Sequence, residues 1–376
     1  MNIQSRRRLA SVTGIALVGT FAISGCASDN NSSAATSASG AKSNPVNCAK
    51  GTLNGEGSSA QKNAIEQAIT DFQTACPGAT INYNPTGSGA GIKQFIAGQV
   101  DFAGSDSALK TKPAEGATNI EQADADKACG SPAWNIPMVT GPIAVAYNVK
   151  GVDKLILTPA VTAKIFDGTI KTWNDPAIAA INPGVTLPTT AIKVFFRSDE
   201  SGTTENFTKY LSAAAPKDWT AKPGKKWTGK GEGKEKSAGV SSGVKGAEGG
   251  ITYVEWSYAK DNQLGIAQID NGAGPVALSG EAVGKAVSAA KQAGTGNDLA
   301  LKLDYATKES GAYPILLVTY EIVCSKGKDP AKATLTKAFL QSFAAADMQT
   351  KLQEIGYAPL PADIQAKVLT SVNALS

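Results

Sequence analysis

Helix and strand signals alternate along most of this chain, and this alternation limits the folds that it can adopt. Apolar residues between 65 and 72 have the i, i+3, i+4, i+7 spacing of a helix that packs on a core. Residues 81 to 83 alternate between apolar and polar, as a half-buried strand does. The fold class is therefore α/β, with a mostly parallel sheet. We predict further strands at 100–103, 143–149, 193–196, 251–254 and 315–323, and further helices at 89–98, 159–166, after residue 203, at 331–343 and at 361–375.

The length of the chain predicts two lobes. With 376 residues, of which 42% are hydrophobic, the chain is too long for one average domain. We expect lobe I to comprise 46–142 plus 312–376 and lobe II to comprise 143–311. Two segments, near 141–147 and 311–318, should cross between the lobes, and one continuous sheet would contradict this arrangement.

One long section of the chain shows no periodicity. Residues 214–250 contain nine glycines and eight lysines. We predict an irregular surface excursion here, not a linker between domains.

The N-terminus has the layout of an export signal. Arg6, Arg7 and Arg8 precede an apolar stretch at 9–23 that is too short for a membrane span, and small residues then lead to Cys26. We predict a lipoprotein signal peptide at 1–25, lipidation of Cys26 and a flexible polar tether at 26–45. The protein should then be exported and lipid-anchored to the outer face of the cell membrane. The alternative is an ordinary signal peptide with a chance cysteine.

With Cys26 assigned to lipid, four cysteines remain, and an even number in an exported chain predicts two disulfides. The sequence leaves three connectivities open. Metal binding is the alternative, but no close Cys-x-x-Cys pair supports it, so we expect no metal and no cofactor. The four residues are Cys48, Cys76, Cys129 and Cys324.

The composition excludes several classes of function. The chain has no histidine, which removes histidine acid–base catalysis and Ser-His-Asp triads. Its formal net charge is +4, and loss of the three arginines in the signal peptide leaves +1. So small a charge is no footprint of a nucleic-acid-binding protein. We expect a monomer that binds no nucleic acid.

Four junctions between elements carry the same kind of residues. The segments 55–60, 87–91 and 104–106 are rich in glycine and serine, and 197–203 adds Arg197. Three of them open a predicted helix, whose N-terminus presents free N–H groups that suit an oxyanion. Ordinary helix capping explains any single junction. Three junctions and an arginine at strand ends favour an anion site.

Two other motif interpretations fail on context. The segment 87–91 is not a phosphate-binding P-loop, because no Gly-Lys-Ser/Thr follows it. Ser59 and Lys62 match the Ser-x-x-Lys nucleophile motif of penicillin-binding enzymes, but the Lys-Thr-Gly motif is missing.

Taken together, the motifs resemble the phosphate-binding proteins of the high-affinity phosphate ABC transporter, the PstS family, in its actinobacterial lipoprotein branch. The motifs that carry the resemblance lie at 87–92, 101–106, 129–134, 196–204 and 320–325. The resemblance implies a two-lobed periplasmic-binding-protein type II fold that captures inorganic phosphate and delivers it to an ABC permease in the membrane. The implied phosphate ligands are Ser59, the backbone N–H of Ala60, Ser88, Asp106, Arg197, Ser201, Gly202 and Thr203. Ser59 stands where many relatives have threonine, and 230–250 lacks the Gly-Asn-Asp/Asn-Gly segment often found there.

The residue types suggest their roles. Arg197 should give bidentate bonds to two phosphate oxygens, with Asp199 orienting the guanidinium. Asp106 should accept a hydrogen bond from a protonated phosphate oxygen. Sulfate carries no proton at neutral pH and would leave that carboxylate facing an oxyanion, so Asp106 should select phosphate.

Two alternatives remain beside a binding protein without catalysis. One is a phosphatase or phosphoryl-transfer enzyme that uses the same oxyanion cradle. The other is a binding protein for another tetrahedral oxyanion, against which Asp106 argues.

Overall fold

The computed structural model describes residues 46–113, 116 and 118–376. The predicted signal peptide at 1–25, the tether at 26–45 and Cys26 lie outside the described residues. None of the helices in the described part is long and apolar enough to cross a membrane.

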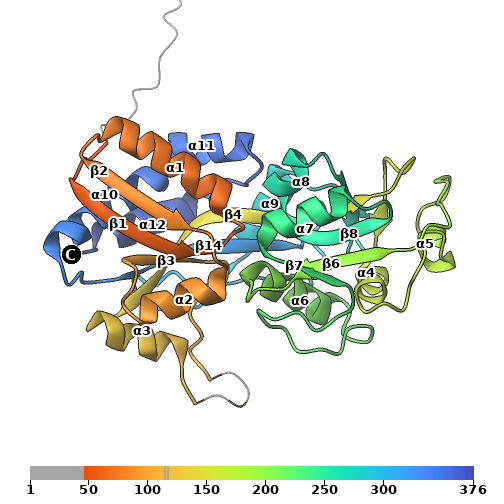
Figure 1. The fold of residues 1–376 in the computed structure, drawn as a ribbon, viewed down its shortest axis with the longest axis horizontal. Coiled ribbons are helices and arrows are strands. Elements are labelled where there is room, and N and C mark those ends of the chain that lie inside the picture. The colour runs from red at the N-terminus through yellow and green to blue at the C-terminus, as the bar shows by residue number, and fades with distance from the viewer. Residues whose placement is uncertain (1–45, 114–115, 117) are drawn as a thin grey trace, which may run out of the picture. The chain divides into compact units, whose positions relative to one another are not determined.

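A mixed sheet of nine strands forms the centre of the fold (Figure 1). The hydrogen-bonded order is β2-β1-β3-β14-β4-β8-β6-β7, and β9 also pairs with β4. The strands are β1 (Gly51–Gly57), β2 (Ala79–Asn84), β3 (Phe102–Ser105), β4 (Ala133–Asn148), β6 (Lys193–Arg197), β7 (Glu232–Lys234), β8 (Gly250–Glu255), β9 (Gly265–Ile266) and β14 (Leu316–Cys324).

The long strand β4 belongs to two halves of this sheet. Its residues 133–142 pair with β14, and its residues 143–148 pair with β8. The expectation of separate sheets is therefore wrong: the segment 141–147 crosses as an unbroken strand. Its residues are buried, since helices cover both faces of the sheet here. The sheet is also less parallel than predicted, because β14 and β8 both run antiparallel to β4.

Strand directions bring two sets of strand ends together. β1 and β3 are parallel to each other and antiparallel to β14, so they run in the same direction as β4. β8 is antiparallel to β4, and β6 is parallel to β8. The carboxyl ends of β1 and β3 therefore meet the carboxyl end of β6 near the middle of β4. Loops that follow these ends form the natural place for a ligand in an α/β sheet.

Helices cover both faces of the sheet (Figure 1). On the first half, α1 and α10 to α12 cover one face, and α2 and α3 cover the other. On the second half, α7 and α8 cover one face, and α4 and α6 the other. The bounds are α1 (Lys62–Ala75), α2 (Ser88–Ile96), α3 (Glu121–Cys129), α4 (Pro159–Phe166), α5 (Pro176–Ala180), α6 (Gly202–Ala214), α7 (Lys236–Lys245), α8 (Trp256–Asp261), α9 (Gly280–Ser288), α10 (Pro330–Phe343), α11 (Ala346–Glu354) and α12 (Ala362–Asn373).

Five short strands lie outside the main sheet. β5 (Ile156–Leu157), β10 (Gln268–Asp270) and β11 (Pro275–Val276) form one small sheet. β12 (Lys291–Gln292) and β13 (Leu301–Lys302) form another.

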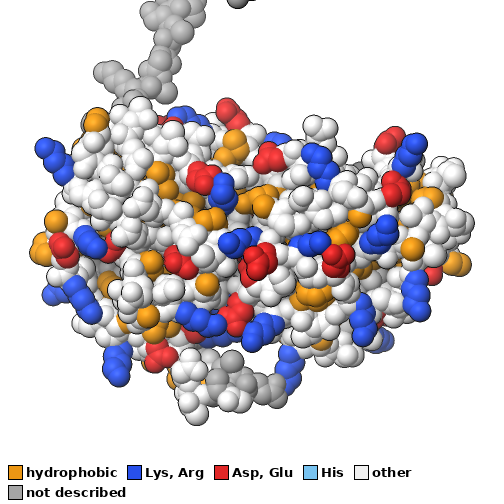
Figure 2. All heavy atoms as spheres, viewed as in Figure 1, with side chains coloured by type: hydrophobic (Ala, Val, Ile, Leu, Met, Phe, Trp, Pro, Cys, Tyr) orange, Lys and Arg blue, Asp and Glu red, His pale blue; other side chains and the backbone are white. Residues whose placement is uncertain are grey.

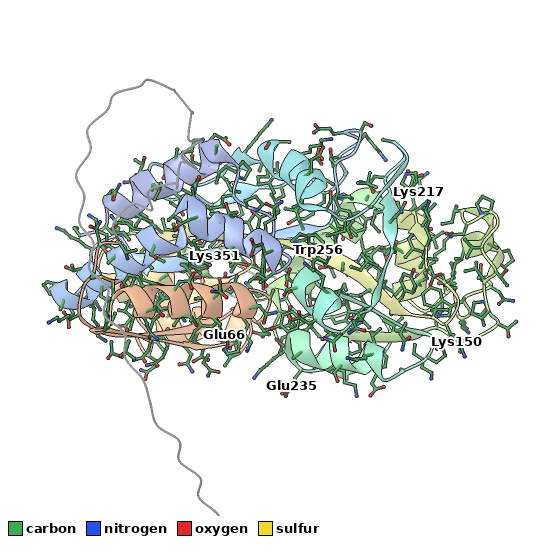
Figure 3. All side chains as sticks on the ribbon, turned by 90° about the horizontal axis from the view of Figure 1, so that it is seen from above. Glu66, Lys150, Lys217, Glu235, Trp256 and Lys351 are labelled. Carbon is green, nitrogen blue, oxygen red and sulfur yellow. A yellow bond between two sulfur atoms is a disulfide. The ribbon has the colours of Figure 1, made fainter. Side chains whose placement is uncertain are left out.

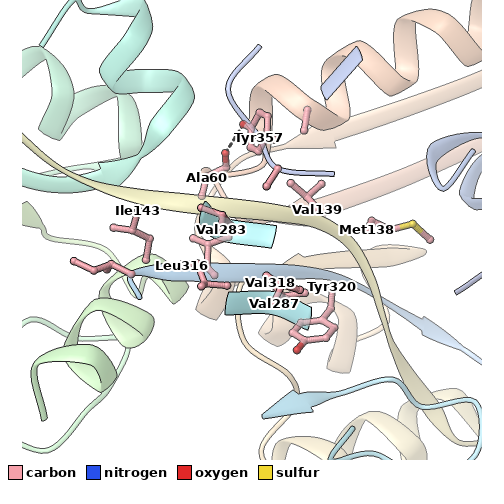
Figure 4. Packing of buried hydrophobic residues seen from close by; sticks show 14 of the residues in the cluster. Ala60, Met138, Val139, Ile143, Val283, Val287, Leu316, Val318, Tyr320 and Tyr357 are labelled. Carbon is pink, nitrogen blue, oxygen red and sulfur yellow. Dashed lines mark hydrogen bonds between the residues drawn. The ribbon is translucent and has the colours of Figure 1, made fainter. Parts of the chain in front are cut away.

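The core is continuous around the shared strand. Figure 4 shows Val139 and Ile143 of β4 near Leu316 and Val318 of β14, and all four side chains are buried. Full burial of one such aliphatic side chain contributes about 1.5–3 kcal/mol. This packing stabilises the middle of the sheet, where the strand ends meet.

The section 214–250 is ordered, so the prediction of an irregular excursion is wrong. It contains β7 and α7, and Val240 and Val244 of α7 are fully buried. The ring of Trp227 packs on Tyr253 with centroids 5.1 Å apart. Apolar residues at helical spacing and the partly buried ring of Trp227 hold this glycine-rich section in the fold.

The structure selects one of the three disulfide connectivities. Cys48 pairs with Cys76, and Cys129 pairs with Cys324. The first bond ties the start of the described chain to the end of α1, and the second ties the end of α3 to the end of β14. All four predicted cysteines are oxidised. Within the described residues, no group of three or more Cys, Asp or Glu side chains is placed to hold a metal ion.

Candidate functional site

Four helix N-termini meet where the two sets of strands end. Ser58 and Ser59 lie just before α1, Ser88 begins α2, Ser201 caps α6, and Ser237 lies in the first turn of α7. Each of these serines is at most 2% exposed. Helix N-termini offer N–H groups and a positive dipole end, and hydroxyls add donors without charge. The cluster therefore offers the uncharged hydrogen-bond donors and positive helix ends that an anion requires.

Asp106 lies at the centre of this cluster, directly after β3. Its carboxylate accepts hydrogen bonds from the hydroxyls of Ser58, Thr319 (2.9 Å) and Thr203 (3.3 Å). Its own N–H donates to Ser88 Oγ at 3.1 Å. Burial raises the pKa of Asp106, and the hydroxyl bonds and the charge of Arg197 offset only part of this. Because its carboxyl group receives three hydrogen bonds from hydroxyls, Asp106 acts as a hydrogen-bond acceptor.

Gly202 allows α6 to reach this carboxylate. A Cβ atom at Gly202 would lie 2.6 Å from both Asp106 Cβ and Ser88 Oγ, which is too close for any side chain. The N–H groups of Gly202 and Thr203 lie in the first helical turn, where a helix has no internal acceptors for them. The structure therefore brings Ser88, Asp106, Gly202 and Thr203 together, as predicted.

Arg197 ends β6 and is 2% exposed. Its Nε and Nη2 donate to the two carboxylate oxygens of Asp199, at 2.7 and 2.5 Å. Burial disfavours the charged guanidinium, but the hydrogen bonds and charge of Asp199 outweigh burial and raise the pKa of Arg197. Burial raises the pKa of Asp199 as well, but the bonds and charge of Arg197 lower it overall. Asp199 thus orients the guanidinium and keeps it charged.

Ser59 meets a residue that the sequence did not reveal. Its Oγ lies 3.1 Å from Ser237 Oγ and accepts from the N–H of Ser237 at 3.1 Å. Arg197 Nη1 also donates to Ser237 Oγ, at 3.3 Å. The helical spacing of Ser237, Val240 and Val244 was the available signal, and the surrounding glycines and lysines hid it.

Two predicted ligands already have local partners. The N–H of Ala60 donates to Ser58 Oγ at 3.1 Å, so this donor is engaged within its own loop. Ser201 Oγ accepts from the N–H of Thr204 at 3.2 Å and so caps α6. Ala60 is buried beside the cluster, and its bond closes a turn before α1. Ser201 is buried within the cluster, and its bond is that of a helix cap.

The charged side chains of the cluster do not by themselves attract an anion, so its uncharged hydrogen-bond donors must bind one. Arg197 and Asp199 compensate each other, and Asp106 adds a carboxylate. A ligand with negative charge must then be held by hydroxyls, N–H groups and helix dipoles. Except for Asp199, whose side chain is 16% exposed, the side chains named above are buried, so this structure shows the site closed. Cavities near α10 and near residues 273–282 do not include them.

A buried ion cluster closes the site on one side. Lys225 Nζ lies 3.1 Å from Glu121 of α3 and 3.6 Å from Glu205 of α6. Glu205 also accepts from Ser107 Oγ at 3.0 Å, one residue after Asp106. Through these contacts the loop after β3 and the helix α3 are tied to α6.

Comparisons with known proteins agree with this architecture. The family model described as "PBP superfamily domain" matches residues 42–347. The structure resembles a high-affinity periplasmic phosphate-binding protein with bound phosphate, at a TM-score of 0.69 and 21% identity, over 85% of this chain and 93% of that one. A phosphate-binding protein from Stenotrophomonas maltophilia gives a TM-score of 0.67 at 19% identity, over 85% and 94%. Fold and site together define a binding protein of the periplasmic type.

Sequence similarity then gives the particular family. Phosphate-binding protein PstS 3 of Mycobacterium leprae is 46% identical over 369 residues, which cover 96% of this chain and 98% of that protein. Phosphate-binding protein PstS 2 of Mycobacterium tuberculosis is 44% identical over 375 residues, at 98% and 99%. Phosphate-binding protein PstS of Xylella fastidiosa is 32% identical over 370 residues, at 96% of each. The chain belongs to the PstS family of phosphate-binding proteins.

Proposed function

We propose that this chain captures inorganic phosphate outside the cytoplasm and delivers it to an ABC permease in the membrane, without catalysis of its own. One observation carries the proposal: a buried carboxylate, Asp106, lies among hydroxyls and helix N-termini beside a charged Arg197. A dianion that keeps one proton can donate a hydrogen bond to this carboxylate and accept hydrogen bonds from the hydroxyl and N–H groups around it. Family membership supports the same ligand.

Asp106 gives the site its selectivity. A phosphate oxygen that carries a proton donates to this carboxylate, while the remaining oxygens accept from the hydroxyls and N–H groups. Sulfate has no proton to donate at neutral pH, so its oxygen and the carboxylate repel each other. Arg197 supplies the positive charge that any tetrahedral dianion requires.

Calorimetric titration of the wild type with phosphate and sulfate at neutral pH tests this mechanism. We expect tight binding of phosphate and far weaker binding of sulfate. Asp106→Asn should weaken phosphate binding less than it weakens the discrimination, because an amide also donates to a fully ionised oxyanion. The surface variant Asp363→Asn on α12 is the matched control and should change neither affinity. Comparable affinities of the wild type for the two anions would refute the proposal.

The proposed cycle opens and closes two lobes, 46–142 plus 312–376 and 143–311. β4 changes its pairing partner from β14 to β8 between residues 142 and 143, which supports a boundary there. Contacts between the two parts include Lys93 with Glu200 at 2.6 Å. Figure 3 shows Glu66 and Lys351, which belong to the first part, to the left of Trp256 and Glu235, which belong to the second part. Small-angle scattering should show a smaller radius of gyration with phosphate than without it.

The lipid anchor on Cys26 and the signal peptide at 1–25 are part of the same proposal. Export and anchoring would hold the protein at the outer face of the cell membrane, close to its permease. Basic and acidic side chains are interspersed over the face seen in Figure 2. Cys26→Ala should release the protein into a soluble fraction as a monomer, and retention of that variant at the membrane would contradict the anchor. Assays for phosphomonoester hydrolysis with added divalent metals should show no turnover.

A further inference from the structure

Behind the anion site lies a buried carboxyl group to which none of the roles above has been given. Glu321 is on β14, two residues after Thr319, whose hydroxyl binds Asp106. Its side chain is fully buried. Within the described part of the chain, neither of its carboxyl oxygens has a hydrogen-bond partner, and the buried Oε1 of Gln61 has none either.

Gln61 connects this carboxyl group to the anion site. It directly precedes α1, and its Nε2 donates to the hydroxyl of Tyr83 at 2.9 Å. Tyr83 in turn donates to the carbonyl of Ser58 at 2.9 Å, and Ser58 Oγ donates to Asp106. A Cβ atom at Gly104 would lie 2.0 Å from Gln61 Nε2, so the amide lies directly against β3. A short polar chain therefore runs from Gln61 to Asp106, and Glu321 lies near the Gln61 end of it.

The surroundings of Glu321 disfavour its ionised form. Among the described residues, the titratable groups that act on it are Asp106 after β3 and Tyr83 of β2. β4 places Ile136 opposite it, and the residue before α1, Gln61, contributes an amide. A buried carboxylate without donors is strongly unfavourable. Burial, reinforced by the negative charge of Asp106 and opposed by Gln61, raises the pKa of Glu321 to about 8.

A neutral Glu321 completes the polar chain. The protonated carboxyl group has one O–H donor, and the nearby Gln61 has a buried acceptor, Oε1, that lacks a partner. A bond between them would fix the amide and, through Tyr83, the loop of Ser58 and Ser59. A neutral Glu321 also adds no negative charge beside Asp106.

We propose that Glu321 is a positioning residue for phosphate binding, which as a neutral acid holds Gln61 and keeps a second negative charge away from Asp106 and the bound anion. This inference rests on the proposed function. When Glu321 loses its proton, it gains a charge close to Asp106 and can no longer donate to Gln61 Oε1. Both changes weaken phosphate binding as the pH rises.

The test compares the dissociation constants for phosphate of the wild type and Glu321→Gln, measured calorimetrically from about pH 6.5 to about pH 9.5, on either side of the raised pKa. The amide of Glu321→Gln still donates to Gln61 Oε1 but cannot ionise. The two constants should agree at the acidic end, and the wild type should bind about tenfold more weakly at the alkaline end, since a nearby like charge changes such equilibria by one or more pKa units. Changes in the protonation of phosphate and of Asp106 with pH affect the dissociation constants of both proteins, so they cancel in the ratio of the two constants. The exposed variant Glu281→Gln on α9 should follow the wild type.

The outcomes separate this inference from the proposed function. If the wild type binds no phosphate at the acidic end, the proposed function fails. If it binds and its pH profile coincides with that of Glu321→Gln, only the role of Glu321 is overturned.

A spectroscopic readout is independent of the ligand. Burial raises the pKa of Glu255 as well as that of Glu321, so both side chains should give the infrared band of a protonated carboxylic acid. The difference spectrum of the wild type minus Glu321→Gln cancels Glu255, and at neutral pH it should contain the band of Glu321, which should disappear on alkaline titration. Absence of the band from this difference spectrum would overturn the proposal. Where Glu321→Gln does not fold, Glu255→Gln removes the other band, and loss of all the intensity at neutral pH in that variant would overturn the proposal in the same way.

Discussion

Replacement of Glu205 by glutamine tests how strongly the buried ion cluster stabilises the closed site. Glu205 lies on α6, is 5% exposed, and contacts Lys225 and Lys209 as well as the hydroxyl of Ser107. Glu205→Gln keeps the shape of the side chain and removes its charge. Lys225 then retains Glu121 as its acidic partner.

The magnitude follows from the pKa of Glu205. Burial raises it, but three lysines outweigh burial and lower it from 4.5 to about 2. One pKa unit corresponds to about 1.4 kcal/mol, so the ionised form stabilises the folded state by about 3 kcal/mol. Because the folded-state pKa is the lower one, this stabilisation is complete above the unfolded-state value and is lost as the pH falls toward 2. The loss between neutral pH and about pH 3 is about 2 kcal/mol.

Urea unfolding followed by tryptophan fluorescence and circular dichroism, at a series of pH values, measures this loss. The unfolding free energies of the wild type and Glu205→Gln should differ most at neutral pH, and the difference should narrow by about 2 kcal/mol by about pH 3. Glu281→Gln, whose side chain is 82% exposed, is the control and should run parallel to the wild type. If the wild-type and Glu205→Gln curves are parallel over the whole range, the charge of Glu205 does not stabilise the fold and the reasoning is refuted.

Three further predictions concern the site and the disulfides. Arg197→Ala should weaken phosphate binding by on the order of 10² to 10³-fold in calorimetry, because it removes the buried positive charge of the site and leaves the half-buried Asp199 without its partner; a loss below tenfold would contradict the role of Arg197. Ser237→Ala should weaken binding by about tenfold without changing the unfolding midpoint greatly, since it removes a hydroxyl shared by Ser59 and Arg197; unchanged affinity would place Ser237 outside the site. Removal of the Cys129–Cys324 bond, which closes 195 residues, should lower the unfolding free energy by about 5 kcal/mol, against about 3.6 kcal/mol for the other disulfide, which closes 28; the reverse order in denaturant titrations would refute the loop-entropy argument.

Local rules identified the elements that carry the site. The predicted strand at 193–196 is β6, and the predicted helix that follows residue 203 is α6, which begins one residue earlier. Hydroxyl and glycine residues at strand-to-helix junctions can be found in a sequence because capping and close backbone approach act within a few residues. The same rules found Asp199, since a carboxylate two residues after Arg197 lies within reach of its guanidinium.

The section 214–250 shows where local rules fail. Its glycines and lysines gave no clear period, so α7 and Ser237 were missed. What holds α7 in place is tertiary: Val240 and Val244 are buried against other elements, and Ser237 meets Ser59, 178 residues away in sequence. Packing of this kind overrides weak propensity.

The sequence by itself determined the alternation of elements, the junctions that hold an anion and the oxidation of four cysteines. Tertiary structure alone decided the continuous strand β4, the disulfide pairing and the isolation of Glu321 behind Asp106. The reason is physical. Capping and periodicity depend on neighbours along the chain. The pairing of strands and cysteines, the burial of side chains and the pKa of a buried carboxyl group depend on which distant segments the fold brings into contact.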